Sequence, residues 1–248
     1  MIVRPRQTGQ MDVAARAVAL DKEGTRLIEV VVADPAADIP TCPGWQATTL
    51  LGHIASGWEA LRVIVESASI APPDFSVFAA APEGHDDLVA FAQERHSRLV
   101  ATLAEADPEL PLWTWSGEKN AAFYQRRAHL ETVVHRVDAE LGAGMRTPVD
   151  PAVGIDAVDE LFSVMLAGVT ESLPSGSLHL HQTDGDGEFM LTVADGTISV
   201  SHEHAKGDAA LRATGDELMT VMWNRRSLDG LELFGDRAVV EQWAALAP

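Results

Sequence analysis

The sequence lacks the features on which disulfide-stabilised and membrane proteins depend. It has a single cysteine, Cys42, so no intramolecular disulfide is possible. A chain without disulfides is typical of the cytoplasm. No stretch approaches the roughly 18 consecutive apolar residues of a membrane-spanning helix. Residues 1–20 have no continuous apolar run, so we expect neither a signal peptide nor a membrane anchor there. These absences predict a soluble, cytoplasmic protein.

Positive charge is also scarce. The chain has 18 Lys and Arg against 37 Asp and Glu, which gives a formal net charge of −19 at pH 7. Such a surface repels phosphate backbones and anionic membranes. The densest basic pairs are Arg126-Arg127 and Arg225-Arg226, too small to offset that repulsion. We therefore expect small-molecule partners, with no nucleic acid and no membrane, and the composition leaves the oligomeric state open.

The first half of the chain has the hydrophobic period of α-helices. The predicted helices cover 9–33, a stretch beginning near Thr48, a stretch from about Leu88 that stops before Pro108, and 121–142. Proline and glycine residues lie in the loops between them. Four consecutive amphipathic helices are typical of a bundle. The fold class is therefore mainly α for this half, which we assign to a first domain, 1–147.

The pattern changes after Pro148. A further helix is predicted over 154–171, and then SLHLHQT, EFMLTV and GTISVSH alternate with period two between Gly and Asp turns. These segments predict a small antiparallel sheet. The remaining segments read as a strand, a helix, a short strand and a final helix: ALRAT, GDELMTVMWNRR, LELFG and DRAVVEQWAAL. We therefore expect a second, α+β domain over 148–248.

The segment RRAHLETVVHRVDAELG, residues 126–142, holds a candidate metal-binding pair. Glu131 and His135 are four residues apart, so on a helix they lie on one face, one turn apart. His129 lies about 160° from Glu131 around the helix and points away. The pair alone is weak evidence for a metal site, because Glu and His at this spacing also occur on many solvated helices.

A third ligand has to come from another helix, and His53 in TTLLGHIASGW is the best candidate. His53 lies at the margin of the apolar stripe of its helix, and Glu131 and His135 lie at the margin of the apolar stripe of theirs. If the two helices pack against each other through their apolar stripes, the three side chains come together. Two imidazoles and one carboxylate form a catalytic zinc set with the fourth position open. Asp138, one turn after His135, is suited to orient that imidazole. The alternative is that His53 is a hydrogen-bonded core histidine and that the pair on 121–142 is solvated.

Sequences around these residues resemble those of the mycothiol-dependent maleylpyruvate isomerase family of the DinB-like superfamily. The matching features are Pro40, Cys42-Pro43-Gly44-Trp45, Leu50-Leu51-x-His53, Arg126-Arg127, Glu131, His135-Arg136, Asp138-Ala139-Glu140, ATGDELMTVMWNRR and LELFGDRAVVEQWAAL. The resemblance implies a DinB-like four-helix bundle followed by a small sterol-carrier-like α+β domain. It also implies that His53, Glu131 and His135 bind a divalent metal, with zinc as the expected ion. It further implies that mycothiol is the co-substrate. One departure is Leu130, where the family commonly has histidine.

The expected activity is that of a metal-dependent isomerase or thiol transferase. A metal with an open position lowers the pKa of a bound thiol and orients it. The thiolate then adds to a small electrophilic substrate. The first alternative is a non-catalytic metal- and ligand-binding protein, whose structural zinc would be closed by four protein ligands. The second is a metal-dependent hydrolase that needs no thiol.

Arg225 is the candidate catalytic residue of the second domain, with Arg226 as the fallback. We expect it to supply a cationic contact to the pocket, because an anionic substrate needs a counter-charge in so acidic a chain. A guanidinium binds a carboxylate with two parallel hydrogen bonds. The resemblance favours this role. The alternative is that Arg225 caps the carbonyls at the end of its predicted helix.

The single cysteine and the other histidines are expected to be structural or solvated. We expect Cys42 to pack rather than act as a nucleophile. The two HxH pairs, 179/181 and 202/204, each share a face of a predicted strand and suit chelation, although a solvated sheet surface is the favoured interpretation. His85 and His96 are expected at the surface.

Overall fold

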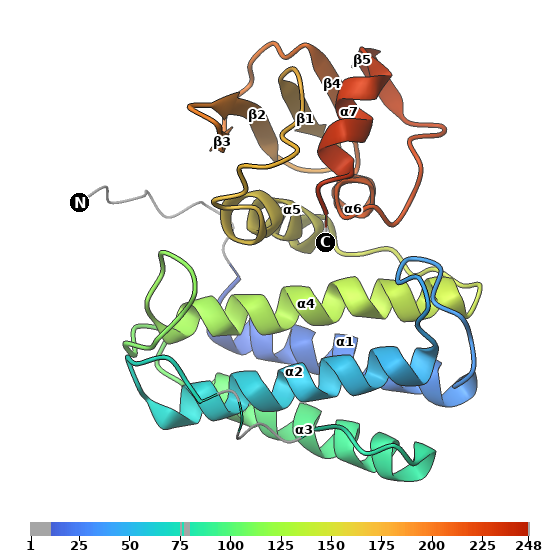
Figure 1. Ribbon diagram of the computed structural model, residues 1–248, viewed down its shortest axis with the longest axis vertical. Coiled ribbons are helices and arrows are strands. Elements are labelled where there is room, and N and C mark those ends of the chain that lie inside the picture. Colours follow the sequence, from blue (N-terminus) through green and yellow to red (C-terminus); the bar gives the residue numbers. More distant parts are fainter. Residues whose placement is uncertain (1–10, 75, 77–79, 248) are drawn as a thin grey trace. The chain divides into compact units, whose positions relative to one another are not determined.

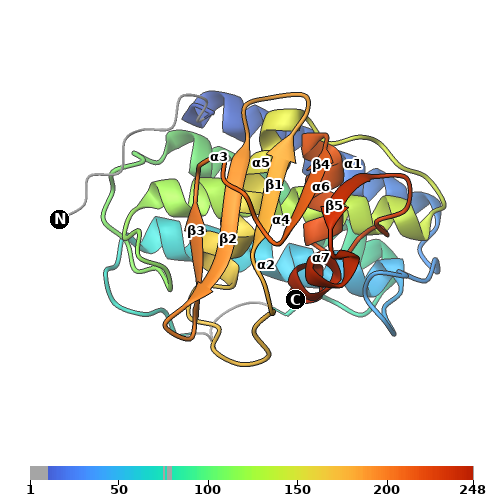
Figure 2. The same cartoon turned by 90° about the horizontal axis from the view of Figure 1, so that it is seen from above.

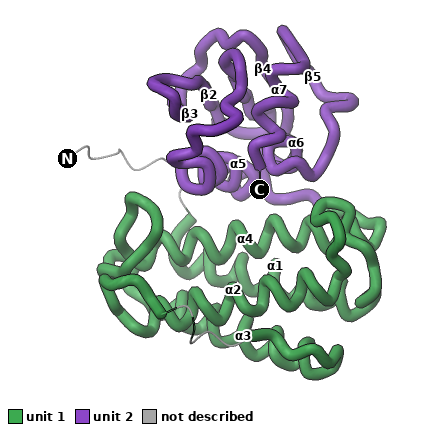
Figure 3. Tube along the Cα trace, viewed as in Figure 1, with its two compact units in different colours: residues 1–147 green, residues 148–248 purple. Residues whose placement is uncertain are grey.

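The structure of the protein, a computed structural model, describes residues 11–74, 76 and 80–247 (Figure 1). Residues 9 and 10, which begin the first predicted helix, lie outside the described residues. The chain divides into two compact units, residues 1–147 and 148–248 (Figure 3). Within the described ranges, no helix combines the length and the apolar character that crossing a bilayer requires.

Unit 1 is a four-helix bundle. Its helices are α1 (Val13–Ala33), α2 (Ala47–Ser67), α3 (His85–Glu105) and α4 (Ala121–Gly142). Helix α1 packs against α3 and α4, and α2 packs against the same two helices. Asp12 and Asn120 cap the N-termini of α1 and α4 through their side chains. The predicted bundle is confirmed.

Helix α4 is buried on nearly every side, which is unusual for a bundle helix. Apolar residues such as Leu130 and Val134 are fully buried, and so are several charged ones. Arg136 bonds through Nε to Glu23 Oε2 at 2.7 Å and through Nη1 to Glu140 Oε2 at 3.0 Å. Pairing of this kind is what makes burial of a charge tolerable. The helix therefore presents polar groups in fixed positions.

The expectation that His96 lies at the surface is wrong. The His96 ring is 4% exposed, its centroid lies 4.9 Å from that of Trp58, and its Nε2 lies 3.3 Å from the carbonyl oxygen of Leu20. Burial lowers the pKa of the imidazole, although the Leu20 carbonyl and Asp21 oppose that shift. A Cβ at Gly24 would lie 2.3 Å from His96 Nε2. The glycine in the middle of α1 therefore makes room for this ring, and contacts between distant helices decided the burial of His96.

Unit 2 is an α+β domain, as predicted. Its elements are α5 (Pro151–Glu160), η2 (Leu161–Met165), β1 (Leu178–Gln182), β2 (Glu188–Ala194), β3 (Thr197–Ser201), β4 (Ala209–Ala213), α6 (Gly215–Met222), β5 (Glu232–Gly235) and α7 (Arg237–Ala244). The five strands lie in the order β3-β2-β1-β4-β5 (Figure 2). Helices α6 and α7 pack against β1 and β4.

The antiparallel pairing predicted for the first three strands is confirmed, and the fourth strand joins them in the other orientation. β4 runs parallel to β1, whereas every other pair is antiparallel. After β3 the chain returns across the sheet and adds β4 on the far side of β1. Period-two alternation shows that a segment is a strand, but it does not show which neighbour the strand will take. The loop that makes this crossing is residues 202–208.

Two predicted helices end earlier than expected. The helix predicted over 154–171 is α-helical only to Glu160, continues as the π-helical turn η2, and is over before Gly168, whose φ is +87°. Helix α6 ends at Met222 because Asn224 adopts a φ of +58°, in the left-handed region. Arg225 and Arg226 therefore lie in the turn after α6 rather than on its last turn.

Candidate metal centre

The structure brings the three predicted metal ligands together. His53 comes from α2, whereas Glu131 and His135 come from α4, which packs against it. His135 Nε2 lies 3.2 Å from Glu131 Oε1, and His53 Nε2 lies 3.7 Å from the same oxygen. The two imidazole rings meet edge to face with centroids 5.1 Å apart. Two nitrogens and one oxygen thus converge from α2 and α4, which are neighbouring helices of the bundle (Figure 1).

These distances suit a small divalent cation. The ligand atoms of His53, Glu131 and His135 all lie within 4.8 Å of one another. Ligands about 2.0–2.1 Å from a tetrahedral zinc are about 3.3 Å apart. The observed separations of 3.2 and 3.7 Å are close to that value. The donor set and its spacing therefore fit zinc, and metal binding by these residues stays a prediction.

Asp138 lies where the sequence placed it, beside His135. Its Oδ2 is 2.9 Å from His135 Nδ1, and its Oδ1 accepts a hydrogen bond from Thr41 Oγ1 at 2.5 Å. A carboxylate on Nδ1 favours the tautomer in which Nδ1 carries the proton. The lone pair of His135 is then on Nε2, the nitrogen that faces Glu131 and His53. Asp138 is fully buried, so this orientation is held firmly.

Arg127 is a site residue to which sequence reasoning assigned no role. Its Nη2 pairs with Glu131 Oε2, one turn along α4. This contact leaves Oε1, the other carboxylate oxygen, facing the two histidines. The i,i+4 spacing of Arg and Glu is a known ion-pair pattern and was visible in the sequence.

His53 is the most accessible of the three ligands, with its side chain 48% exposed. Partial burial is the main cause that lowers the pKa of its imidazole, and electrostatic interactions with His135 and Arg127 lower it further. The neutral form, which alone can ligate a metal, is therefore favoured at neutral pH. The Trp45 ring lies 5.0 Å from the His53 ring, centroid to centroid. Trp45 thus supports one side of His53 while the other ring surfaces stay accessible.

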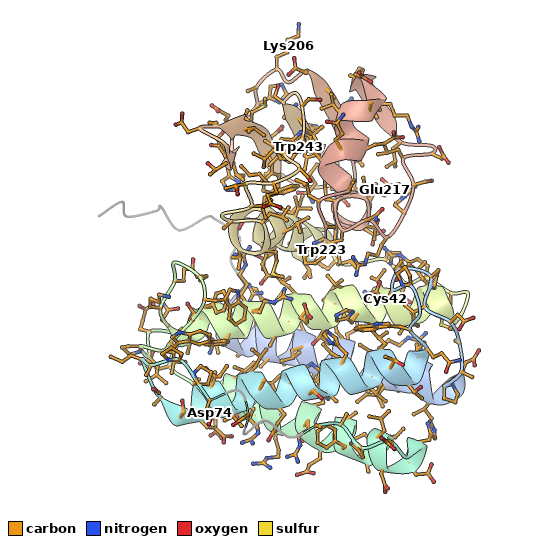
Figure 4. The ribbon with its side chains drawn as sticks, viewed as in Figure 1. Cys42, Asp74, Lys206, Glu217, Trp223 and Trp243 are labelled. Atoms are coloured by element: carbon orange, nitrogen blue, oxygen red, sulfur yellow. The ribbon has the colours of Figure 1, made fainter. Side chains whose placement is uncertain are left out.

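Cys42 lies at the edge of the same site. Its Sγ is 3.9 Å from Asp138 Oδ2, and it is half-buried beside α4 (Figure 4). Cys42, His135 and Asp138 also lie close enough together to hold a metal. That grouping uses His135 Nδ1 and Asp138, which already bond to each other. The packing role predicted for Cys42 agrees with this contact.

The two candidate arginines of unit 2, Arg225 and Arg226, have different surroundings. Arg225 Nη1 donates to the carbonyl of Trp223 at 2.5 Å, and its guanidinium lies 5.9 Å from the centre of the Trp223 ring. This contact is the carbonyl capping that the sequence left as an alternative. Arg226 forms an ion pair with Glu217, 3.0 Å from Nη1 to Oε1. A substrate contact by Arg225 stays a prediction.

Comparison with known proteins agrees with the sequence resemblance. Residues 17–140 match the family profile described as the mycothiol maleylpyruvate isomerase N-terminal domain. Residues 152–242 match the profile described as the MDMPI C-terminal domain. The two profiles together span both units. No curated protein sequence matches the chain.

Two solved structures share the fold. One is the crystal structure of a mycothiol-dependent maleylpyruvate isomerase, with a TM-score of 0.59 and 13% sequence identity, covering 90% of this chain and 93% of that one. The other is a mutant of that isomerase with one histidine replaced by alanine, with a TM-score of 0.58, 13% identity and the same coverage. At this identity the likeness establishes the arrangement of the elements alone.

Proposed function

The chain belongs to the mycothiol maleylpyruvate isomerase family, and we propose that it is a zinc- and mycothiol-dependent enzyme that isomerises a small electrophilic substrate. Transfer of the thiol to such a substrate is the closest variant of this chemistry. The observation that carries the proposal is the convergence of His53, Glu131 and His135 on one point between two helices. A cytoplasmic location stays a prediction from the single cysteine.

Three protein donors leave one tetrahedral position for a further ligand. A divalent metal held there supplies a positive charge that lowers the pKa of a coordinated thiol. The protein's own contribution is orientation. Asp138 keeps the proton of His135 on Nδ1, and Arg127 keeps Glu131 turned so that one oxygen faces the histidines. The exposed side of His53 leaves a path by which a thiol reaches the site.

The proposed reaction is tested by turnover of maleylpyruvate, the substrate named for the structural relatives. We expect the zinc-loaded protein to consume maleylpyruvate only when mycothiol is added, because the metal site activates the thiol rather than water. The measurement is the loss of maleylpyruvate and the appearance of its isomer with and without mycothiol. Hydrolysis of ester or amide substrates without any thiol would favour the hydrolase alternative and contradict the proposal.

We further propose that Arg225 binds a carboxylate of the substrate or of the thiol conjugate. Arg225→Lys keeps the positive charge but loses the two-pronged hydrogen bond, so turnover should fall about tenfold. Zinc content and melting temperature should not change. Arg226→Lys is the matched control, because Arg226 is already paired with Glu217. Unchanged turnover in Arg225→Lys would leave this residue as a cap on the Trp223 carbonyl.

A further inference from the structure

A second group of convergent histidines lies in unit 2, on the face of the sheet opposite its buried leucines. His179 Nε2 lies 2.5 Å from Glu188 Oε2. His181 Nδ1 lies 2.5 Å, and His204 Nδ1 3.2 Å, from the other carboxylate oxygen, Oε1. The four ligand atoms all lie within 4.8 Å of one another. Three imidazoles thus surround one carboxylate, and we call these four residues the sheet cluster.

The sheet register explains how three of these residues meet. His179 and His181 are two apart on β1, so their side chains leave the same face. The leucines that alternate with them, Leu178 and Leu180, are fully buried on the other face. Glu188 begins β2 and lies directly opposite His181 in the antiparallel ladder. A residue pair in this register has its side chains on one face at close range. The arrangement is therefore built into the strands.

The fourth residue arrives on the loop that crosses the sheet. β3 ends at Ser201, and His204 lies three residues later, at the start of the path to β4. Its ring meets that of His179 edge to face, with centroids 4.8 Å apart. The parallel placement of β4 beside β1 requires this loop to pass over β2 and β1 (Figure 2). The crossover thus brings His204 above the strand histidines.

The structure corrects the pairing expected for the second HxH motif. His202 does not share a face with His204. Its Nε2 lies 3.2 Å from Asp159 Oδ1 and its ring packs 5.0 Å from that of Phe189. The strand has ended by this point, so the alternation of a strand no longer holds. His202 therefore serves as a natural comparison residue, two positions from His204 but outside the sheet cluster.

Hydrogen bonds alone explain part of this arrangement. Burial raises the pKa of Glu188, but the hydrogen bonds from His179, His181 and His204 outweigh that effect and lower it overall. Three imidazoles converge on this one carboxylate, and the His179 side chain is 7% exposed. Three nitrogens and one carboxylate oxygen are also a complete zinc ligand set.

We propose that His179, His181, Glu188 and His204 bind one divalent transition-metal ion of the zinc type. Imidazole nitrogens select zinc and its neighbours in the first transition row over the harder ions magnesium and calcium, which prefer all-oxygen sites. Four protein ligands close a tetrahedral site, which is the arrangement of structural zinc. This site lies in unit 2 and does not depend on the proposed function or on the ligands in α2 and α4.

Entry of the ion requires only a small adjustment. Tetrahedral ligands of zinc are about 3.3 Å apart, so Glu188 must move away from His179 and His181 by about 1 Å. The Glu188 side chain is 23% exposed and has room to rotate. An open cavity of about 420 Å³ borders the cluster at His179 and His204. Lys206, which also lines it, is exposed and extends away from the sheet, leaving access from solvent (Figure 4).

The metal would join three separate parts of unit 2. His179 and His181 belong to β1, Glu188 to β2, and His204 to the loop between β3 and β4. His204 is 74% exposed at its side chain, so contacts with the rest of the protein hold it only weakly. An ion that binds only the folded protein raises the free energy of unfolding. The increase grows with the logarithm of the ratio between the ion concentration and the dissociation constant of the site. Zinc should therefore raise the melting temperature of unit 2.

The test uses the full chain with both predicted helical-site histidines removed, His53→Ala/His135→Ala, so that only the sheet cluster remains. After treatment with a chelator, this variant is titrated with Zn²⁺ in competition with a chromophoric chelator. We expect one Zn²⁺ per chain and a higher melting temperature in zinc. Adding His204→Ala should weaken this binding at least 100-fold and abolish the thermal shift, and His181→Ala should do the same. Adding His202→Ala should change neither.

Each result is informative because His204 is exposed and its removal leaves the strands intact. Far-ultraviolet circular dichroism verifies that every variant is folded. The proposal is overturned if the double variant binds no Zn²⁺, or if His204→Ala and His181→Ala bind it as tightly as their parent. Mg²⁺ and Ca²⁺ at the same concentrations should give no thermal shift, and an equal shift from either would contradict the zinc-type assignment. Failure of the helical site changes none of these readings.

Discussion

Replacing His53 by alanine is expected to weaken zinc binding at the helical site by at least about 100-fold, since loss of a direct ligand costs more than the 10- to 100-fold typical of its supporting contacts. His53 is one of only three protein donors there, and Glu131 and His135 both come from the other helix. Its side chain is 48% exposed, so its removal should leave the core of the bundle unchanged. The measurement is a competition titration with Zn²⁺ on chelator-treated protein.

This experiment needs a background without the sheet cluster. In His204→Ala, one zinc site is expected to remain, so its loss on adding His53→Ala is read directly. His129→Ala is the matched control on α4, because that histidine lies two residues before Glu131 but points elsewhere. Because His129 is buried, circular dichroism is used to verify that the His129→Ala variant is folded. Equal zinc affinity in His53→Ala and its parent would show that these three residues do not form a metal site.

Removing the metal is expected to weaken mycothiol binding by at least about 30-fold at pH 7. A free thiol has a pKa near 8.5, so only about 3% is thiolate at that pH, whereas a coordinating cation deprotonates it outright. Arg127, a cationic side chain at this site, is already paired with Glu131. Calorimetric titration of mycothiol into zinc-loaded and metal-stripped protein measures the difference.

Two controls tie this loss to the helical site. Re-addition of Zn²⁺ to the stripped protein should restore mycothiol binding. The His204→Ala variant should bind mycothiol as tightly as the parent, because the sheet cluster has no part in the proposed thiol chemistry. Equally tight binding to the metal-stripped protein would refute metal-dependent thiol activation. It would leave zinc binding itself untouched.

Most of the helical metal site could be predicted from residue spacing within single helices. The i,i+4 spacing of Glu131 and His135 placed both on one face of a helix, and the i,i+3 spacing placed Asp138 beside them. The position of His53 beside the apolar stripe of its own helix made it the candidate for the third ligand, and the family resemblance supported that choice. These are short-range relations within a helix, so the sequence carries them directly. The pairing of Arg127 with Glu131 follows from the same spacing and was available from it.

The sheet cluster shows where local patterns end. Alternation along β1 predicted that His179 and His181 share a face, and they do. It could not predict that Glu188 lies opposite His181, because that depends on the length of the turn and the register of the hairpin. The position of His204 depends further on the crossover to β4. The same alternation wrongly paired His202 with His204, since the strand had already ended.

The sequence by itself determined the helical first half and the α+β second half of this chain, the four helices of the bundle and the five strands of the sheet. All of these follow from periodicity, which is a property of neighbouring residues. The tertiary structure alone decided the parallel pairing of β1 with β4, the burial of His96 against Gly24, and the meeting of three histidines around Glu188. Each of these joins residues distant in the chain, and such contacts depend on how loops close and helices pack, which no local pattern encodes.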